Sequence, residues 1–219
     1  MTETWDFLQL PAASAPFNMA LDEALLRAAV ERRRPLLRVY SWEQPAVSIG
    51  YFQKFPAHLA GKIDIVRRPT GGGLVYHDED TTYTVVVPPT HRLYEVPTAD
   101  TYCAIHKAIA AALDVKSQIA DLKSQTPRPG YECFQNPVRG DVVADGRKLA
   151  GAAQRRTKWG MLHQGSVAAT LAAAQIVEGF RGELGVEFRP YELSTEESAA
   201  ARWLTSEKYA TNPWNKRVT

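Results

Sequence analysis

Cysteine is scarce in this sequence, since only Cys103 and Cys133 occur among its 219 residues. Two cysteines do not suggest a disulfide framework, and residues 1–6 lack the basic and apolar regions of an export signal. We therefore expect a cytoplasmic protein. Long hydrophobic runs are also missing, because none approaches the roughly 18 apolar residues of a membrane span. We expect no membrane partner.

An excess of charge of one sign is absent too, because 26 lysines and arginines face 24 aspartates and glutamates. Domains that bind nucleic acid usually show a strongly basic face, so we expect no nucleic-acid partner. The five histidines show no metal-ligand spacing, and we expect no metal. The chain is long enough to bury a full core, and 45% of its residues are hydrophobic. We expect one domain over residues 1–219.

Hydrophobic periodicity predicts helices over residues 19–30, 98–113 and 171–180. Asn18 is a candidate N-cap for the first, and Ser194 opens a fourth helix with a capping box. Strand patterns cover residues 37–42, 46–52, 64–68, 74–77, 82–87, 141–144, 147–150 and 161–169. Asp145-Gly146 indicates a tight hairpin. Because helices and strands are interspersed without clean alternation, the expected fold class is α+β, with a mixed or antiparallel sheet flanked by helices.

The first candidate site is the segment from Arg67 and Arg68 to the triplet Gly71-Gly72-Gly73. Three glycines let the backbone adopt positive φ and approach a ligand closely, and N–H groups exposed in such a turn can bind an anion or a carbonyl oxygen. The two arginines would add positive charge. A flexible hairpin connection is the alternative. The segment is not a P-loop, because no Gly-Lys-Ser/Thr follows it.

Lys148 is the second candidate. It lies in a predicted hairpin strand, where a lysine is usually a solvated edge charge. The small residues Ala150-Gly151-Ala152-Ala153 follow it closely. They leave room for a slender ligand along the strand, and they are equally consistent with tight sheet packing.

Cys133 is the third candidate, because it lies in a proline-rich loop. A nucleophile and an inert thiol are both open alternatives for it. Activation would need a cation or amides that stabilise the thiolate, and Lys148, His77 and His163 are candidates. Cys103, beside the apolar stripe of a predicted helix, is expected to be buried and inert.

Taken together, these segments resemble the biotin/lipoate protein-attachment family, in its branch of lipoate ligases and LipM-type octanoyltransferases. The similarity runs along almost the whole chain and keeps the family's order of motifs. It rests on residues 17–24, 37–52, 67–73 with His77-Asp78, 146–154, 163–166, 207–209 and 214–215. The resemblance implies the α+β catalytic fold shared by class II aminoacyl-tRNA synthetases and biotin and lipoate ligases.

The resemblance also implies roles for individual residues. Cys133 would be a catalytic residue that carries the acyl group as a thioester, and Lys148 would be the second catalytic residue. The residues implied in substrate binding are Arg67, Arg68, Thr70, Gly71, Gly72, Gly73, His77, Asp78, Gly151, Ala152 and His163.

Two activities occur in this branch of the family. Octanoyltransferases take the acyl group from octanoyl-acyl carrier protein and need no cofactor, whereas lipoate ligases use ATP and Mg to form an acyl-adenylate. Cys133 and the stretch from His77 to Thr84 resemble the transferases, while Gly73 follows the ligase pattern, since transferases usually carry arginine there.

The expected function is therefore octanoyl transfer in protein lipoylation, and a lipoate–protein ligase or an inactive binding homologue are the alternatives. The acceptor would be a lysine on a lipoyl domain, of either the glycine-cleavage H protein or an E2 subunit of a 2-oxoacid dehydrogenase.

Overall fold

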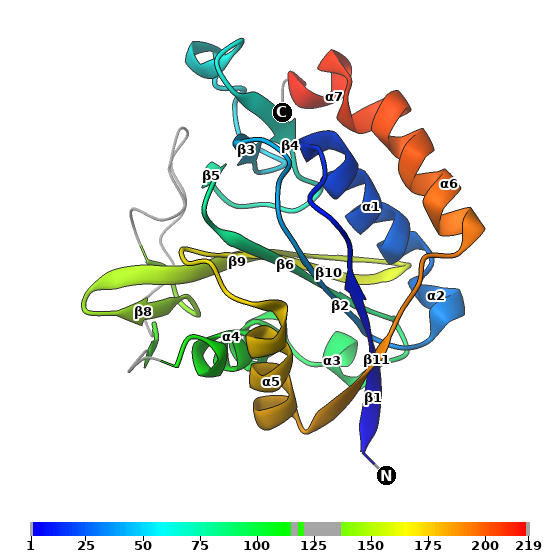
Figure 1. Ribbon diagram of the computed structural model, residues 1–219, viewed down its shortest axis with the longest axis vertical. Coiled ribbons are helices and arrows are strands. Elements are labelled where there is room, and N and C mark those ends of the chain that lie inside the picture. The colour runs from blue at the N-terminus through cyan, green and yellow to red at the C-terminus, as the bar shows by residue number, and fades with distance from the viewer. Residues whose placement is uncertain (1, 115–117, 121–136, 218–219) are drawn as a thin grey trace.

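A computed structural model describes residues 2–114, 118–120 and 137–217, which form two β-sheets and the helices around them (Figure 1). The larger sheet has eight strands in the order β11-β1-β2-β6-β10-β9-β8-β7. Their bounds are Glu3–Gln9 (β1), Leu36–Tyr40 (β2), Thr81–Val87 (β6), Gln118–Ile119 (β7), Val142–Ala144 (β8), Arg147–Thr157 (β9), Gly160–Val167 (β10) and Val186–Pro190 (β11). β1 pairs in parallel with β2 and β11, and the remaining pairs are antiparallel, so the sheet is mixed.

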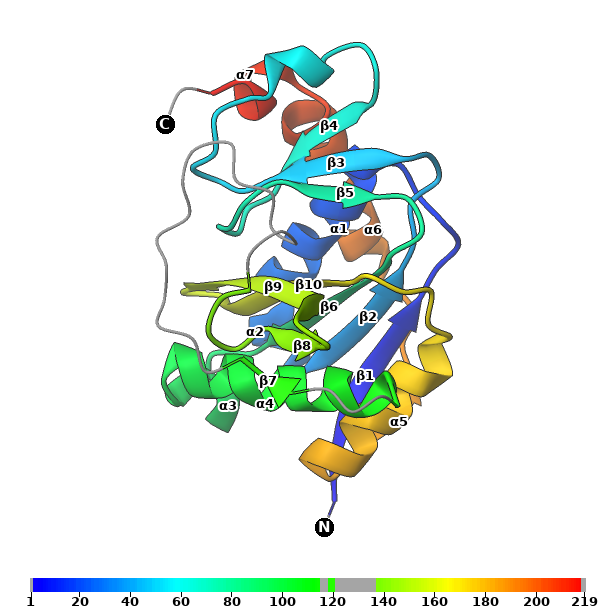
Figure 2. The same cartoon turned by 90° about the vertical axis from the view of Figure 1, so that its left-hand side faces the viewer.

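The smaller sheet has the order β4-β3-β5, with β3 over Ala46–Ile49, β4 over Asp64–Arg67 and β5 over Val75–His77. Figure 2 shows it standing above the middle strands of the larger sheet. The chain between β4 and β5 forms the glycine loop, residues 69–74. The Thr70 hydroxyl in this loop donates a hydrogen bond of 2.7 Å to Gln164 of β10, so the loop lies against the larger sheet.

Helices cover both faces of the larger sheet. α1 (Ala15–Arg27) and α6 (Thr195–Leu204) lie on the face nearer the smaller sheet, and α4 (Thr98–Ala112) and α5 (Ala173–Leu184) lie on the other (Figure 1). The shorter helical segments are α2 (Ala29–Arg32), α3 (Arg92–Glu95), α7 (Asn212–Asn215), a 3₁₀ turn at Ala57–Leu59 and a π-helical turn at Thr205–Tyr209. Among the described helices none is long and apolar enough to cross a bilayer.

Side chains of β6 point alternately to the two faces of the larger sheet, so this strand packs against the helices on both faces. Val86 packs in the cluster that contains Leu25 of α1, whereas Val85 packs in the cluster that contains Ile109 of α4 and Phe180 of α5. Successive side chains of a strand point to opposite faces, and both faces of this strand are covered. The opposite orientation of alternate side chains predicted for residues 82–87 is confirmed.

Local turn and cap signals are confirmed as well. The backbone at Asp145 and Gly146 has φ values of 49° and 73°, as the tight turn between β8 and β9 requires. α4 matches the helix predicted over residues 98–113, and the Ser194 side chain caps α6 by accepting a hydrogen bond from the Glu197 amide.

The expected N-cap at Asn18 is wrong. α1 begins at Ala15 with Ser14 at the N-cap position, so Asn18 lies inside the helix. There its side chain donates to the carbonyls of Ala13 and Ser41 and ties α1 to the segment after β2. The strands on either side of residues 43–45 exist as β2 and β3, but they belong to different sheets. The sequence pattern does not reveal β1 or β11, which pair with partners distant in the chain.

Candidate active site

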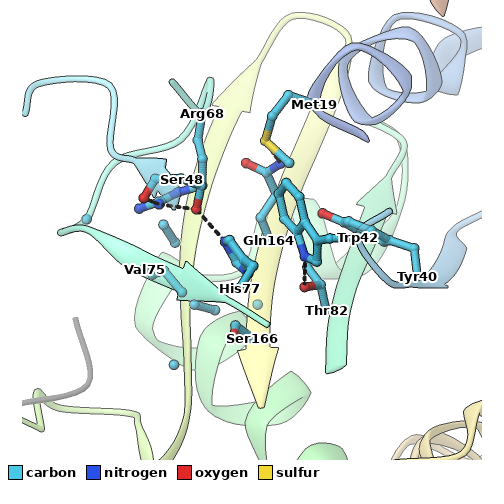
Figure 3. A pocket seen from close by; sticks show the side chains of 15 residues that line it. Met19, Tyr40, Trp42, Ser48, Arg68, Val75, His77, Thr82, Gln164 and Ser166 are labelled. Carbon is cyan, nitrogen blue, oxygen red and sulfur yellow. Dashed lines mark hydrogen bonds between the residues drawn. The ribbon is translucent and has the colours of Figure 1, made fainter. Parts of the chain in front are cut away.

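A pocket of about 400 Å³, including its opening, lies between the two sheets (Figure 3). Apolar and aromatic side chains from α1, the β2 region and β5 form part of its wall, and three successive small residues of β9 form another part. The pocket is lined by Met19, Tyr40, Trp42, Ser48, Arg68, Gly72, Val75, His77, Thr82, Gly151, Ala152, Ala153, Gln164, Gly165 and Ser166. Of the two alternatives for the small residues of β9, a slot along the strand and tight sheet packing, the structure shows the slot.

Lys148 lies beside this slot and is buried, with 2% of its side chain exposed. Its Nζ is 2.8 Å from Oδ2 of Asp141, which is itself inaccessible to solvent. A Cβ added to Gly151 would lie 2.3 Å from Cε and 2.4 Å from Nζ of Lys148, so a larger residue here would require the ammonium group to leave its present position. Lys148 is thus a buried cation held by a carboxylate, and not the solvated edge charge that lysine in a hairpin usually is.

The glycine loop is held by the buried guanidinium of Arg68. Its Nη2 donates hydrogen bonds of 2.8 Å to the carbonyl oxygens of Gly71 and Gly73, and its Nη1 donates to the carbonyl and the hydroxyl of Ser48. Gly72, between the two bonded carbonyls, has a φ of 88°, in the left-handed region that glycine favours. The loop therefore has a defined conformation and is not a flexible hairpin connection.

His77 lines the pocket from β5 and is buried, stacked on Trp42 with ring centroids 4.0 Å apart. Its Nε2 is 2.6 Å from the Ser48 hydroxyl and its Nδ1 is 2.8 Å from Oδ2 of Asp80. Burial lowers the pKa of the His77 imidazole below its usual value, although the nearby Asp80 carboxylate opposes this effect. The ring is therefore neutral near pH 7.

A buried polar network behind the pocket is not evident from the sequence. Asp22, in the middle of α1, accepts hydrogen bonds from Arg38, Thr84 and Gln164. Gln164 in turn accepts the bond from Thr70, so α1 is linked to the glycine loop through one side chain. Polar residues such as Asn18 and Asp22 within an otherwise apolar helix face are the sequence signal that could have indicated this network.

The structure brings many of the expected site residues together. Arg68, Gly72, His77, Gly151 and Ala152 line the pocket. The other expected residues contact these lining residues. Lys148 lies against Gly151, the Thr70 hydroxyl donates to Gln164, and the carbonyls of Gly71 and Gly73 accept from Arg68. Cys133 lies outside the described residues.

Three of the expected site residues lie elsewhere. The Arg67 guanidinium donates to backbone carbonyls that include those of Gly50 and Asn215, and burial lowers its pKa. His163 is buried toward α4, and burial holds its pKa well below its usual value. Asp78 lines a separate hollow beside β5.

Two remaining expectations concern cysteine and metal. Cys103 on α4 is half-buried, so it is less enclosed than its position beside an apolar stripe suggested. Across the parts of the chain that the structure describes, no group of three or more His, Cys, Asp or Glu side chains is arranged to hold a metal ion.

The chain belongs to the lipoyl protein ligase A/B catalytic domain family, which matches residues 14–183. Octanoyltransferase LipM of Bacillus subtilis (strain 168) is 32% identical over 97% of this chain and 98% of its own length. Octanoyltransferase LipM of Oceanobacillus iheyensis is 34% identical over 83% of this chain and 70% of its own length. The family resemblance drawn from the sequence is confirmed, and the family is one of enzymes.

Solved structures confirm the expected fold class. A lipoate-protein ligase A bound with ATP has a TM-score of 0.80 at 23% identity, over 100% of both chains. A bi-partite lipoate protein ligase from Thermoplasma acidophilum has a TM-score of 0.74 at 21% identity, over 100% of this chain and 98% of that one. At such identities the likeness concerns the fold alone.

Proposed function

We propose that this protein transfers an octanoyl group from a carrier-protein thioester to a lysine of a lipoyl domain, and that Cys133 holds the group between the two steps. The observation that carries the proposal is the buried Lys148–Asp141 pair beside a narrow slot. It occurs in a chain whose relatives, matched along nearly its full length, are named octanoyltransferases.

The first step is a thioester exchange. The Cys133 thiolate attacks the carbonyl carbon of the carrier-bound octanoyl group, and the carrier's thiolate leaves and takes up a proton. This exchange replaces one thioester by another and is nearly isoenergetic, so it needs no ATP. Because the acyl group then stays on the enzyme, two bulky carrier proteins never have to bind at the same time.

The second step forms the stable product. The neutral amine of the acceptor lysine attacks the Cys133 thioester, the Cys133 thiolate leaves, and the nitrogen loses a proton to give an amide. In both steps negative charge develops on the acyl oxygen, and a preorganised cation in a water-poor site stabilises such charge strongly. Lys148 is a buried cation beside the slot and supplies this charge.

The pocket holds the eight-carbon chain. The pocket is narrow and its volume of about 400 Å³ includes the open mouth, so its lining and not its size supports this occupant. Apolar wall groups from Met19, Val75 and Trp42 suit a saturated chain, while Gly151 and Ala152 bring the slot next to Lys148. We place the acyl carbonyl at the Lys148 end and the methyl end toward Trp42.

The alternative function is an ATP-dependent lipoate–protein ligase, which would use ATP and Mg to make an acyl-adenylate. Gly73 is the observation in its favour, because a glycine triplet is typical of ligases. In the proposed transferase no cofactor takes part. The family relatives imply a lipoyl-domain acceptor in both cases. We propose octanoyl-acyl carrier protein as the donor, the H protein or an E2 subunit as the acceptor, and the cytoplasm as the location.

The test is to incubate the purified protein with octanoyl-acyl carrier protein in the absence of nucleotide and to measure its mass. We expect one octanoyl adduct, which Cys133→Ala abolishes together with transfer to a lipoyl domain. Cys103→Ala is the matched control, and we expect it to keep both reactions. If Cys133→Ala still acylates the domain, or if free octanoate with ATP is the sole working donor, the ligase function replaces the transferase.

A further inference from the structure

Four side chains form a hydrogen-bonded series from the glycine loop to the turn before β6. Arg68 binds the Ser48 hydroxyl, and the same hydroxyl lies 2.6 Å from His77 Nε2 (Figure 3). Arg68 also binds the loop carbonyls, and His77 Nδ1 lies 2.8 Å from Asp80. The four residues come from different segments: the end of β4, β3, β5 and the turn before β6. None of these contacts is required to close either sheet.

The direction of each hydrogen bond follows from the two ends of the series. The Asp80 carboxylate can only accept, so His77 Nδ1 carries the proton and donates it to Asp80. In the neutral ring Nε2 is then the accepting nitrogen, and the Ser48 hydroxyl donates to it at 2.6 Å. The Arg68 guanidinium can only donate, so the Ser48 oxygen accepts from Nη1 at 2.8 Å. Every bond points the same way, from the cation to the anion.

The hydrogen bonds from Arg68 fix the orientation of two peptide groups in the glycine loop. In a trans peptide the N–H points opposite to the C=O. Arg68 draws the carbonyls of Gly71 and Gly73 toward itself, so the amides of Gly72 and Leu74 point away from it. Backbone amides fixed in this way can stabilise a developing oxyanion.

We infer that Asp80, His77, Ser48 and Arg68 act as one polarised relay whose task is to fix the peptide orientation of the glycine loop. Asp80, His77 and Ser48 are then positioning residues that act through Arg68, and His77 transfers no proton in the reaction. The charged groups that face His77 are Asp80 and Arg68, one at each end of the relay. This inference rests on the proposed function only for what the oriented amides bind.

The relay predicts that Asp80 and the amides of the glycine loop are coupled through Ser48. We propose to record ¹⁵N spectra of the substrate-free protein at neutral pH. The His77 ring should show its proton on Nδ1, and Asp80→Asn should shift the amide signals of Gly72 and Leu74. In a Ser48→Ala background, where the relay is cut, Asp80→Asn should leave these two signals unmoved.

Kinetics provide a second, independent readout. Ser48→Ala should lower kcat by about fivefold with KM changed by less than about twofold, because a lost orienting bond of this kind is typically worth about 1 kcal/mol. Asp80→Asn should then cause no further loss in the Ser48→Ala protein. Ser194→Ala removes a hydroxyl that also accepts a hydrogen bond, at the α6 N-cap, and should lower stability without changing kcat.

Two results would overturn the relay: a His77 ring protonated on Nε2 at neutral pH, or additive effects of Ser48→Ala and Asp80→Asn on the loop amides and on kcat. The spectra need no substrate. A failure of the proposed function, seen as absent nucleotide-free transfer by the unmodified protein, is therefore distinct from a failure of the relay.

Discussion

Replacing Gly151 by alanine tests whether the position of Lys148 matters for transfer. An alanine Cβ at this site would lie 2.4 Å from Nζ, whereas ordinary contact begins at 3.4 Å, so the ammonium group must move by about 1 Å. That displacement competes with its 2.8 Å contact to Asp141. A misplacement of about 1 Å in a catalytic group can cost roughly 100-fold in rate. We expect kcat of Gly151→Ala to fall by about this factor.

A double-mutant cycle shows whether the loss passes through Lys148. Single-turnover transfer from the octanoyl-loaded enzyme to a lipoyl domain is measured for Gly151→Ala, Lys148→Ala and both changes together. Residues in direct contact give non-additive effects, so alanine at 151 should cost less than about threefold once Lys148 is absent. Gly182→Ala on α5 is the matched control, because its added Cβ meets no atom within 4 Å, and its activity should equal that of the unmodified protein.

Two outcomes of this cycle would refute the reasoning. Full activity of Gly151→Ala would mean that the lysine has room to adjust without loss. An equal loss with and without Lys148 would mean that the methyl group obstructs the acyl chain and that the lysine position is immaterial.

Three further predictions concern single groups. Lys148→Ala should slow transfer by about two to three orders of magnitude, since one electrostatic contact of this kind is worth roughly 3–4 kcal/mol in the transition state; Lys148→Arg should rescue it poorly, as single-turnover rates will show. Gly72→Ala should lower both stability in urea and activity, because a φ of 88° strains any L-residue and the added Cβ would lie 3.1 Å from Arg68. Gly61→Ala is the control: its φ is 76° but its added Cβ meets no atom within 4 Å, so it should lower stability alone. Burial lowers the pKa of His106 to about 3, so between pH 6.5 and 3 the unfolded chain binds a proton at this residue and the folded chain does not. The stability contribution of neutral His106 is therefore complete above pH 6.5 and should decline by roughly 1 kcal/mol per pH unit as the pH falls toward 3. Urea titrations should show a shallower decline for His106→Asn.

Signals confined to a few neighbouring residues predict their structure well. The Asp145-Gly146 turn and the Ser194 cap depend on bonds within one turn of the chain, and both are present. Strands such as β1 have no local marker of this kind, because β1 is defined by parallel pairing with β2 and β11. Their existence follows from contacts that only the folded chain makes.

Arg67 and Arg68 show the same limit within the candidate site. The sequence pattern gives these adjacent residues one shared role, but alternation along a strand sends their side chains to opposite sides. Arg68 points to the pocket and binds the glycine loop, while the Arg67 backbone and guanidinium bind Asn215. The position of the sheet relative to the site decides which of two neighbouring cations faces the site. The spacing of residues in the sequence does not give that position.

The dependence of the site region on late segments of the chain has a consequence for folding during synthesis. β11 covers one side of β1, α6 covers α1, and Asn215 accepts the backbone N–H of Arg67 directly before the glycine loop. Domains generally fold as units while the ribosome extends the chain. The strands that carry the glycine loop therefore emerge from the ribosome long before their last partners, and their contacts are complete only after Asn215 has left the exit tunnel.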